Sequence, residues 1–327
     1  MPLLIDSRRL DVSLPAARIL QTCPQLEERA RNLRSQTTQV VGADKFLYVQ
    51  QRELATTTPN DSSISILGSE DATTCHIIVL RHTGSGATCL AHCDGSDSEN
   101  EVAAIVQAVK SLTKTTEGRL ELHIVGGFND QRQLSLKLSR QLLKVFHRQP
   151  EDVHLVTFCV TDINDKEENG IHLPIIYGIG GCMKANFLRC DLYFLSIPHI
   201  AVNVKTGEIS KATFPDRQPD EDLRSAYILT GGHMVNIYDA ENEQLNIGPY
   251  SWQPFPNIDF WLNQEDRQIL ECFSTSPQAE PPHFVQHMKS SLQYLKDNPH
   301  PQVSVFPNGE PRSYKKKADG QWERIKN

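Results

Sequence analysis

Residues 75–93 read CHIIVLRHTGSGATCLAHC, and this stretch decides the fold. Two runs rich in strand-forming residues, 76–80 and 87–91, flank the glycine-containing segment 81–86. Apolar runs of this length on either side of a turn-forming segment are typical of a β-hairpin. The sequence therefore predicts that these two runs form antiparallel strands.

The register of this hairpin decides which side chains meet. If the turn is centred between Thr83 and Gly84, Cys75 lies directly opposite His92. Directly opposed residues point to the same face, with Cβ atoms about 4.5–5.5 Å apart. Because side chains alternate along a strand, one face carries Cys75, Ile77, Val79, Leu90 and His92, and the other carries His76, Cys89, Ala91 and Cys93.

A thiol beside an imidazole can generate a thiolate nucleophile and a general acid for its leaving group. Cys75 and His92 are therefore the predicted catalytic pair. Two other interpretations stay open: a cysteine at a strand end is often a small buried hydrophobic residue, and His76, Cys89 and Cys93 are zinc ligands in type but lack a fourth partner.

The segments after the hairpin indicate the fold class. Apolar residues three and four positions apart predict helices at 99–112, with Ser96 or Ser98 as cap, and at 134–146. Strands are predicted at 63–67, 120–125 and 154–160. This order of strands and helices predicts an α/β (α+β) fold in which mixed sheets are packed with helices.

The remaining predicted elements extend over the rest of the chain. No repeat or break in composition divides residues 1–327, so we expect a single catalytic domain. Helices are predicted at 24–34, 262–273 and 282–295, strands at 46–49, 177–179, 201–204, 208–214, 234–238 and 244–247, and a hairpin around Asp319-Gly320.

Composition excludes several classes of partner and compartment. The 327 residues include 33 Lys and Arg against 40 Asp and Glu, a net charge of −7, and the only basic run is 315–317. Nucleic acids and anionic membranes bind clustered cations, so neither is expected. Because no apolar stretch approaches the roughly 18 residues of a membrane helix or forms a signal peptide, we expect a cytoplasmic protein that can also be nuclear. Its eight cysteines are then expected to be reduced.

Gly126 and Gly127 follow the predicted strand 120–125. Such a pair commonly forms a strand-to-helix turn. Backbone N–H groups at glycines can also stabilise the oxyanion formed in amide chemistry. The pair is a candidate substrate-binding element, and it is not a dinucleotide fingerprint, because the G-x-G-x-x-G spacing is absent.

At these residues the sequence resembles the protein N-terminal asparagine amidohydrolases. The resemblance centres on DATTCH at 71–76 within 63–81. It extends to LEERAR at 26–31, LYVQQREL at 47–54, VGGF at 125–128, IYDAE at 237–241, IGPYSW at 247–252 and EPPHFV at 280–285.

The resemblance implies hydrolysis of the side-chain amide of an N-terminal asparagine to give N-terminal aspartate and ammonia. The product can be arginylated and read as a degradation signal of the N-degron pathway. It implies that Cys75 is the nucleophile, that no cofactor or metal is needed, and that the substrates are proteins and peptides with a free N-terminal asparagine. The hairpin also looks like that of bacterial glutamine deamidases and cytotoxic necrotizing factors, which supports His92. We expect a monomer.

Several further residues are candidates for binding and orienting the substrate. Asp94, Asp239 or Glu241 can accept the substrate's α-ammonium group. Ser65, Ser69 or a backbone carbonyl can orient His92, and Ser69 and Thr74 are also candidate substrate-binding residues. Tyr250 is a candidate for the pocket wall, whereas Trp252 is expected in the core.

One segment departs from the family pattern. In the family pattern, residues 176–179 continue directly into 201–204. In this sequence the segment 180–200, which contains Cys182 and Cys190, lies between them. We interpret 180–200 as an insertion. Two other functions also remain open: an N-terminus-binding module without turnover, which would tolerate Cys75→Ala, and another Cys–His acyl-transfer enzyme such as a protease or transglutaminase.

Overall fold

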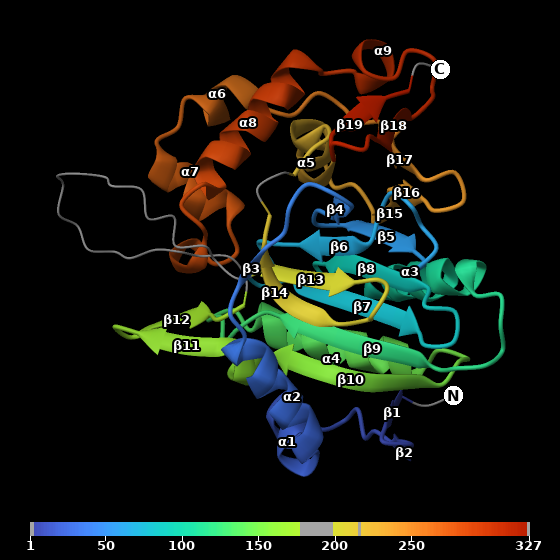
Figure 1. Ribbon diagram of the computed structural model, residues 1–327. Helices are drawn as coiled ribbons and strands as arrows, with labels where there is room; N and C mark the ends of the chain where they lie inside the picture. The colour runs from blue at the N-terminus through green and yellow to red at the C-terminus, as the bar shows by residue number, and fades with distance from the viewer. Residues whose placement is uncertain (1–2, 177–198, 215–216, 326–327) are drawn as a thin grey trace.

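The computed structural model describes residues 3–176, 199–214 and 217–325. Its centre is an eight-stranded mixed sheet (Figure 1). The strands lie in the order β15 (Val235–Asn236), β5 (Glu53–Thr57), β8 (Thr88–Cys93), β7 (His76–His82), β9 (Leu120–Gly126), β10 (Val153–Val160), β1 (Leu3–Ile5) and β2 (Arg8–Arg9). Strand β10 is parallel to both β9 and β1, whereas β7 is antiparallel to both β8 and β9. The predicted α/β class is confirmed.

The predicted hairpin forms between β7 and β8, but its predicted register is wrong. Ile77, not Cys75, lies opposite His92, and Cys75 directly precedes β7. The turn is centred one position later because His82 N–H donates to Ala87 O over 2.9 Å and Gly86 ends the loop at φ +72°. Opposed positions shift by two residues, an even number, so the predicted division of side chains between the two faces is preserved.

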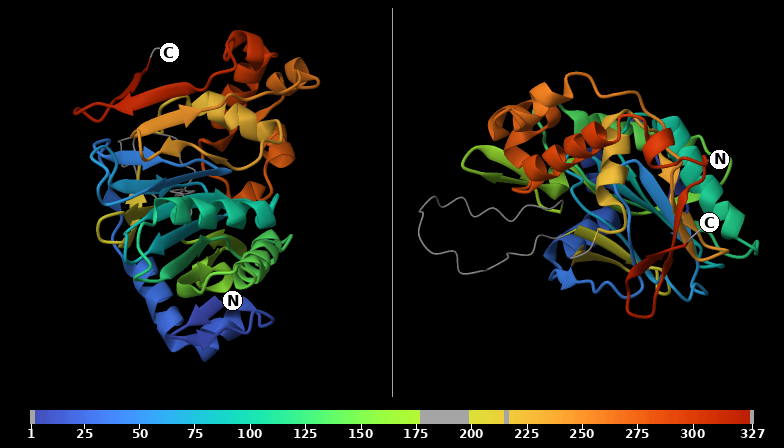
Figure 2. Two further views of the ribbon diagram at one scale, coloured as in Figure 1. Left: turned by 90° about the vertical axis from the view of Figure 1, so that its right-hand side faces the viewer. Right: turned by 90° about the horizontal axis from the view of Figure 1, so that it is seen from above.

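Helices cover one face of the eight-stranded sheet. Helix α3 (Ser98–Leu112) packs on β7 and β8, and α4 (Leu134–His147) packs on β7 and β10; Figures 1 and 2 show the two helices side by side. His76 points to this face, since its Nε2 lies 2.7 Å from Ser139 Oγ of α4. The cap of α3 is Asp97, which accepts from Asn100 N–H, in place of the predicted Ser96 or Ser98.

A second sheet and α2 cover the opposite face. The sheet has the order β3 (Gln39–Val40), β14 (Ile209–Thr213), β13 (His199–Asn203), β6 (Ile66–Ser69) and β4 (Phe46–Tyr48), and α2 is Pro24–Ser35. Strand β6 contacts β8, while α2 contacts β10 and β14. His92, one residue along from Cys93, points toward this second sheet, where it meets Ser69. The two faces of the hairpin therefore have separate surroundings.

The C-terminal part lies above the main sheet in Figure 1 and contains a four-stranded sheet with several helices. The predicted strand 234–238 is split, because Ile237 N–H donates to Leu54 O while Ile237 O accepts from Asn246 N–H. Ile237 thus joins the main sheet to this smaller one. The smaller sheet consists of β16 (Tyr238–Asp239), β17 (Gln244–Ile247), β18 (Arg312–Lys316) and β19 (Trp322–Arg324).

The predicted helix 262–273 is also split, into α6 (Ile258–Leu262) and α7 (Asp266–Phe273). Asn263 Nδ2 donates to Asp259 O over 2.7 Å and Gln264 Nε2 donates to Phe260 O over 2.9 Å. These side chains satisfy the last carbonyls of α6, as expected at a helix end. The predicted helix 282–295 is confirmed as α8 (Phe284–Asp297), which packs against α5 (Glu221–Leu229), α6 and α7.

The predicted C-terminal hairpin is confirmed as β18 and β19. Several elements were not predicted, among them β1, β2, β3, β5 and α5 described above. They also include α1 (Ala16–Thr22), α9 (Pro301–Ser304), the hairpin of β11 (Asp165–Glu168) and β12 (Ile171–Pro174), and the short helical turns Thr161–Asn164 and Pro277–Ala279. Of the predicted insertion 180–200, residues 180–198 lie outside the described residues, as does the predicted strand 177–179. Ile200 belongs to β13, where it pairs with Ser69 and Lys211.

One cluster of buried apolar side chains extends from Leu3 in β1 to Tyr314 in β18. It fills the space on both faces of the main sheet and continues beneath α5 and the C-terminal sheet. Within the described ranges, no helix is long and apolar enough to cross a membrane. The prediction of a single domain is compatible with this continuous core.

Candidate active site

Cys75 and His92 line the same cavity, which has a volume of about 500 Å³. Its walls come from the loop after β4, the loop before β7, and residues of α4, α5 and α8. The two residues reach it because they lie on one face of the hairpin, near the same end. The cavity is therefore built from segments far apart in the sequence around the predicted catalytic pair.

The Cys75 side chain is half-buried, directly before β7. Burial raises the pKa of its thiol well above the usual value, and the carboxylates of Asp94 and Glu280 raise that pKa further. In the absence of substrate the sulfur is therefore a neutral thiol at pH 7. A base is needed to make it a nucleophile.

His92 has the position and protonation state of such a base. It is 2% exposed, and burial lowers the pKa of its imidazole to about 4, so the ring is neutral at pH 7. Its Nδ1 lies 2.9 Å from Ser69 Oγ, whereas Nε2 has no hydrogen-bond partner among the described residues. When Nδ1–H donates to Ser69, Nε2 is left with a lone pair that can accept a proton.

Ser69, at the end of β6, thus contacts His92 on the Nδ1 side of the ring. Ser69 is one of the groups that the sequence offered for orienting His92. It is completely buried and does not belong to the cavity lining. Its position fits a residue that orients the imidazole and not one that contacts substrate.

The loop that carries Cys75 is held by the segment before α8. Thr74 Oγ1 lies 3.0 Å from Thr275 Oγ1, and Thr73 Oγ1 lies 3.5 Å from Glu280 Oε2. Thr73, Thr74, Thr275 and Glu280 all line the cavity. Thr74, a candidate substrate-binding residue, is therefore at the site, and its observed contact is with Thr275 on the opposite wall.

Gly126 and Gly127 lie beside this loop but not in the cavity lining. A Cβ at Gly126, where φ is +125°, would lie 2.7 Å from the carbonyl oxygen of Cys75. At Gly127, where φ is +65°, a Cβ would lie 2.7 Å from His76 Cε1. The glycines allow the close approach of β9 to the backbone of the nucleophile loop.

Asp94, one of the candidates for binding the substrate's α-ammonium group, lines the cavity and is already paired with cationic and polar groups. Arg52 Nε lies 2.6 Å and Gln51 Nε2 2.8 Å from its Oδ2. Burial alone would raise the pKa of Asp94, but the hydrogen bonds from Ser96 and the charge of Arg52 outweigh burial and lower it. This carboxylate is ionised and its charge is balanced by Arg52.

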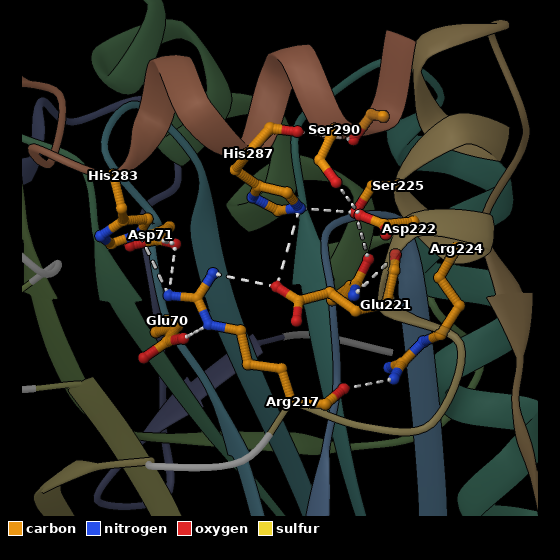
Figure 3. A network of polar contacts seen from close by, with 12 residues as sticks. Glu70, Asp71, Arg217, Glu221, Asp222, Arg224, Ser225, His283, His287 and Ser290 are labelled. Carbon is orange, nitrogen blue, oxygen red and sulfur yellow. Dashed lines mark hydrogen bonds and ion pairs between the residues drawn. The ribbon is translucent and has the colours of Figure 1, made fainter. Parts of the chain in front are cut away.

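A second ionic cluster forms another wall of the cavity (Figure 3). The Arg217 guanidinium pairs with Glu70. Its Nη2 lies 3.1 Å from Asp71 Oδ2, and its Nη1 lies 3.7 Å from Glu221 Oε1. His283, directly before α8, has its Nε2 3.2 Å from Asp71 Oδ2. Sequence reasoning missed this cluster, although Asp71 and His283 fall in the quoted stretches 71–76 and 280–285.

Three further predicted site residues also lie outside the cavity lining. Asp239 and Glu241 line a different cavity, beside the turn between β16 and β17. Asp239 accepts hydrogen bonds from the backbone N–H groups of Glu241 and Asn242 over 3.0 and 3.1 Å, the ordinary role of a turn carboxylate. Tyr250 is buried and stacks on Tyr227 with ring centroids 4.0 Å apart.

Trp252 is buried, as predicted, and its Nε1–H donates to Asn298 O over 2.9 Å. Cys89, Cys93 and Cys159 are buried free thiols, whereas Cys272 is exposed. Over the described ranges, no group of three or more His, Cys, Asp or Glu side chains is arranged to hold a metal ion.

The family model and the known relatives that match this chain carry the same description. The sequence model of a family described as protein N-terminal asparagine amidohydrolase matches residues 36–189 and 187–324. The chain belongs to this family. Relatives with that name in Sus scrofa and Homo sapiens are each 56% identical over 326 residues, which is 99% of this chain and 98% of the relative. One in Arabidopsis thaliana is 26% identical over 324 residues, 91% of this chain and 86% of its own length.

Three of the sequence stretches that carry the family resemblance converge on the cavity. They are 47–54, which contains Gln51 and Arg52, 71–76, which contains Cys75, and 280–285, which contains Glu280 and His283. Two others, 237–241 and 247–252, contribute to the smaller sheet and the core beneath α5. Within this family member, the candidate site is therefore the cavity around Cys75 and His92.

Proposed function

We propose that this chain hydrolyses the side-chain amide of an N-terminal asparagine to aspartate and ammonia, with Cys75 as nucleophile and His92 as general base and acid. One observation supports the roles most directly. His92 and Cys75 line one cavity, Ser69 holds His92 Nδ1, and His92 Nε2 has no described partner. The amidohydrolase family of the chain supports the substrate.

The reaction begins with a neutral pair. His92 Nε2 takes the proton of the Cys75 thiol as the sulfur attacks the amide carbon, which forms a tetrahedral intermediate. Transfer of that proton to the amide nitrogen lets the C–N bond break and ammonia leave. A thioester between Cys75 and the former asparagine side chain remains.

A water molecule completes the reaction by hydrolysing the thioester, with His92 again transferring the proton. His92 Nε2 removes a proton from a water molecule that attacks the thioester carbon, and the sulfur leaves as its bond to carbon breaks. The proton on His92 returns to the sulfur, and the side chain is now a carboxylic acid. Each step uses only Cys75, His92 and water.

The ionic state of the pair explains why substrate is needed for activation. Burial favours the uncharged form of both groups, so an imidazolium–thiolate pair is not present at rest. Proton transfer then accompanies attack on the bound amide. A resting neutral thiol is also less reactive toward oxidants than a thiolate.

Ammonia release from defined peptides tests the function. Peptides that begin with Asn, Gln or acetyl-Asn are incubated with wild type and with Cys75→Ser. We expect ammonia and an amide-to-acid mass change from the Asn peptide and wild type only. Binding of the peptide without ammonia release would favour an N-terminus-binding module, and turnover of an internal or acetylated site would favour another Cys–His acyl-transfer enzyme.

We further propose that the product enters the N-degron pathway and that the protein acts as a monomer in the cytoplasm. Size-exclusion chromatography with light scattering tests the monomer. Localisation of the tagged full chain tests the compartment.

A further inference from the structure

We propose that Glu280 is the carboxylate that binds the substrate's α-ammonium group and thereby restricts the reaction to free N-termini. This inference rests on the proposed function. It assigns a specificity-determining role to a residue in the stretch 280–285, which the catalytic pair leaves unexplained.

The substrate's own geometry fixes where such a group must lie. In asparagine, the α-nitrogen and the side-chain amide carbon are separated by three covalent bonds. When Cys75 attacks that carbon, the α-ammonium group must therefore sit on the cavity wall next to the sulfur. Glu280 lines this cavity together with Cys75, and its Oε2 is 3.5 Å from Thr73 Oγ1, two residues before the nucleophile.

Four carboxylates among the described residues line the cavity, and three of them already face an arginine. Glu70 and Asp71 pair with Arg217, and Asp94 pairs with Arg52. Glu280 forms no ion pair with any described residue. Its hydrogen bonds come from hydroxyl groups, over 2.5 Å from Ser274 Oγ and 3.5 Å from Thr73 Oγ1. Of these four carboxylates, Glu280 is therefore the one that can form a new ion pair with a bound cation.

The surroundings of Glu280 favour an incoming cation. Asp71 adds negative charge, His283 adds a partly compensating positive one, and Cys75 is uncharged at rest. Burial is the largest cause that raises the pKa of Glu280, to about 7. A buried carboxylate without a partner gains most from an ion that brings opposite charge.

Binding at Glu280 would also act on the nucleophile. The charge of Glu280 is one of those that raise the pKa of Cys75. An ammonium group seated against Glu280 offsets that charge, so the thiol loses its proton more readily. An acetylated N-terminus brings no such charge, so recognition of the free N-terminus and activation of Cys75 are coupled.

The test compares two peptides that differ only at the α-nitrogen. One begins with asparagine, and the other begins with a 3-carbamoylpropanoyl group, which has the same side-chain amide but no amine. For wild type, kcat/KM is expected to favour the asparagine peptide by about 100-fold, a loss typical of removing one partner of a buried charge pair. Glu280→Gln, which keeps the shape and an oxygen acceptor, is expected to lose most of this preference.

Matched variants separate the proposed role from a structural one. Glu271→Gln removes the same charge from an exposed position on α7 and should keep the preference. Glu280→Asp retains the charge but withdraws it by one methylene, so it should keep part of the preference; this variant carries the test if Glu280→Gln does not fold. An unchanged preference, or an equal loss on both peptides, overturns the role of Glu280. Wild type that releases no ammonia from the asparagine peptide would instead overturn the proposed function.

Discussion

Replacing Ser69 by alanine tests whether His92 must be held to act as base and acid. The change removes the hydroxyl 2.9 Å from His92 Nδ1, at a site where both side chains are buried. Because the imidazole becomes charged when it takes the thiol proton, the lost bond is one to a charged group. Such bonds contribute about 1.5–3 kcal/mol, which corresponds to a fall in kcat of about 10- to 150-fold. KM should change little, since Ser69 does not line the cavity.

Ser139→Ala is the matched control. Ser139 Oγ lies 2.7 Å from Nε2 of the buried His76, on the other face of the same hairpin. Both variants should lose about 1–3 kcal/mol of unfolding free energy, because each leaves a buried ring nitrogen without a partner. Kinetics of ammonia release and urea unfolding measure the two effects. If kcat of Ser69→Ala equals that of Ser139→Ala, Ser69 does not orient a catalytic histidine.

Two further predictions concern stability and backbone geometry. Burial lowers the pKa of His123 to about 4. In the unfolded chain this side chain takes up a proton near pH 6.5, and in the folded protein it does so only near pH 4, so acid favours unfolding across that range. His123→Gln should therefore reduce the loss of unfolding free energy between pH 6.5 and 4 by about 3 kcal/mol; parallel curves from urea unfolding would contradict this. Gly126→Ala places a Cβ 2.7 Å from Cys75 O and should lower both stability and kcat. Gly170→Ala, also at positive φ but with no atom within 4 Å, should cost only about 1–2 kcal/mol; equal kcat in the two variants would argue against a displaced nucleophile.

Side-chain alternation made the faces of the central hairpin predictable. Successive side chains of any β-strand point to opposite faces, so Ile77, Val79 and Leu90 share one face, and the same alternation places His92 on it. The register was not predictable, because the turn contains glycine at both 84 and 86 and either supports a tight turn. Only the structure shows that Gly86 adopts the positive φ that ends the loop.

Distant contacts explain what else the sequence could not reveal. Glu280 reaches the cavity because α8 packs on α5 and holds the preceding loop against Thr73. Nothing local distinguishes its carboxylate from those of Asp239 and Glu241, which occupy a turn in another sheet. The buried ion pair of Arg224 with Glu53, which joins α5 to β5, depends on the same long-range packing.

Trapping the covalent intermediate tests the role of Cys75 most directly. Wild type is mixed with an asparagine-initiated peptide, quenched in acid within one turnover, and examined by intact mass spectrometry and peptide mapping. We predict an adduct equal to the peptide mass less one ammonia, attached at Cys75 and absent from Cys75→Ser. Ammonia release by Cys75→Ser at the wild-type rate, or an adduct on another residue, would contradict the assignment of Cys75 as the nucleophile.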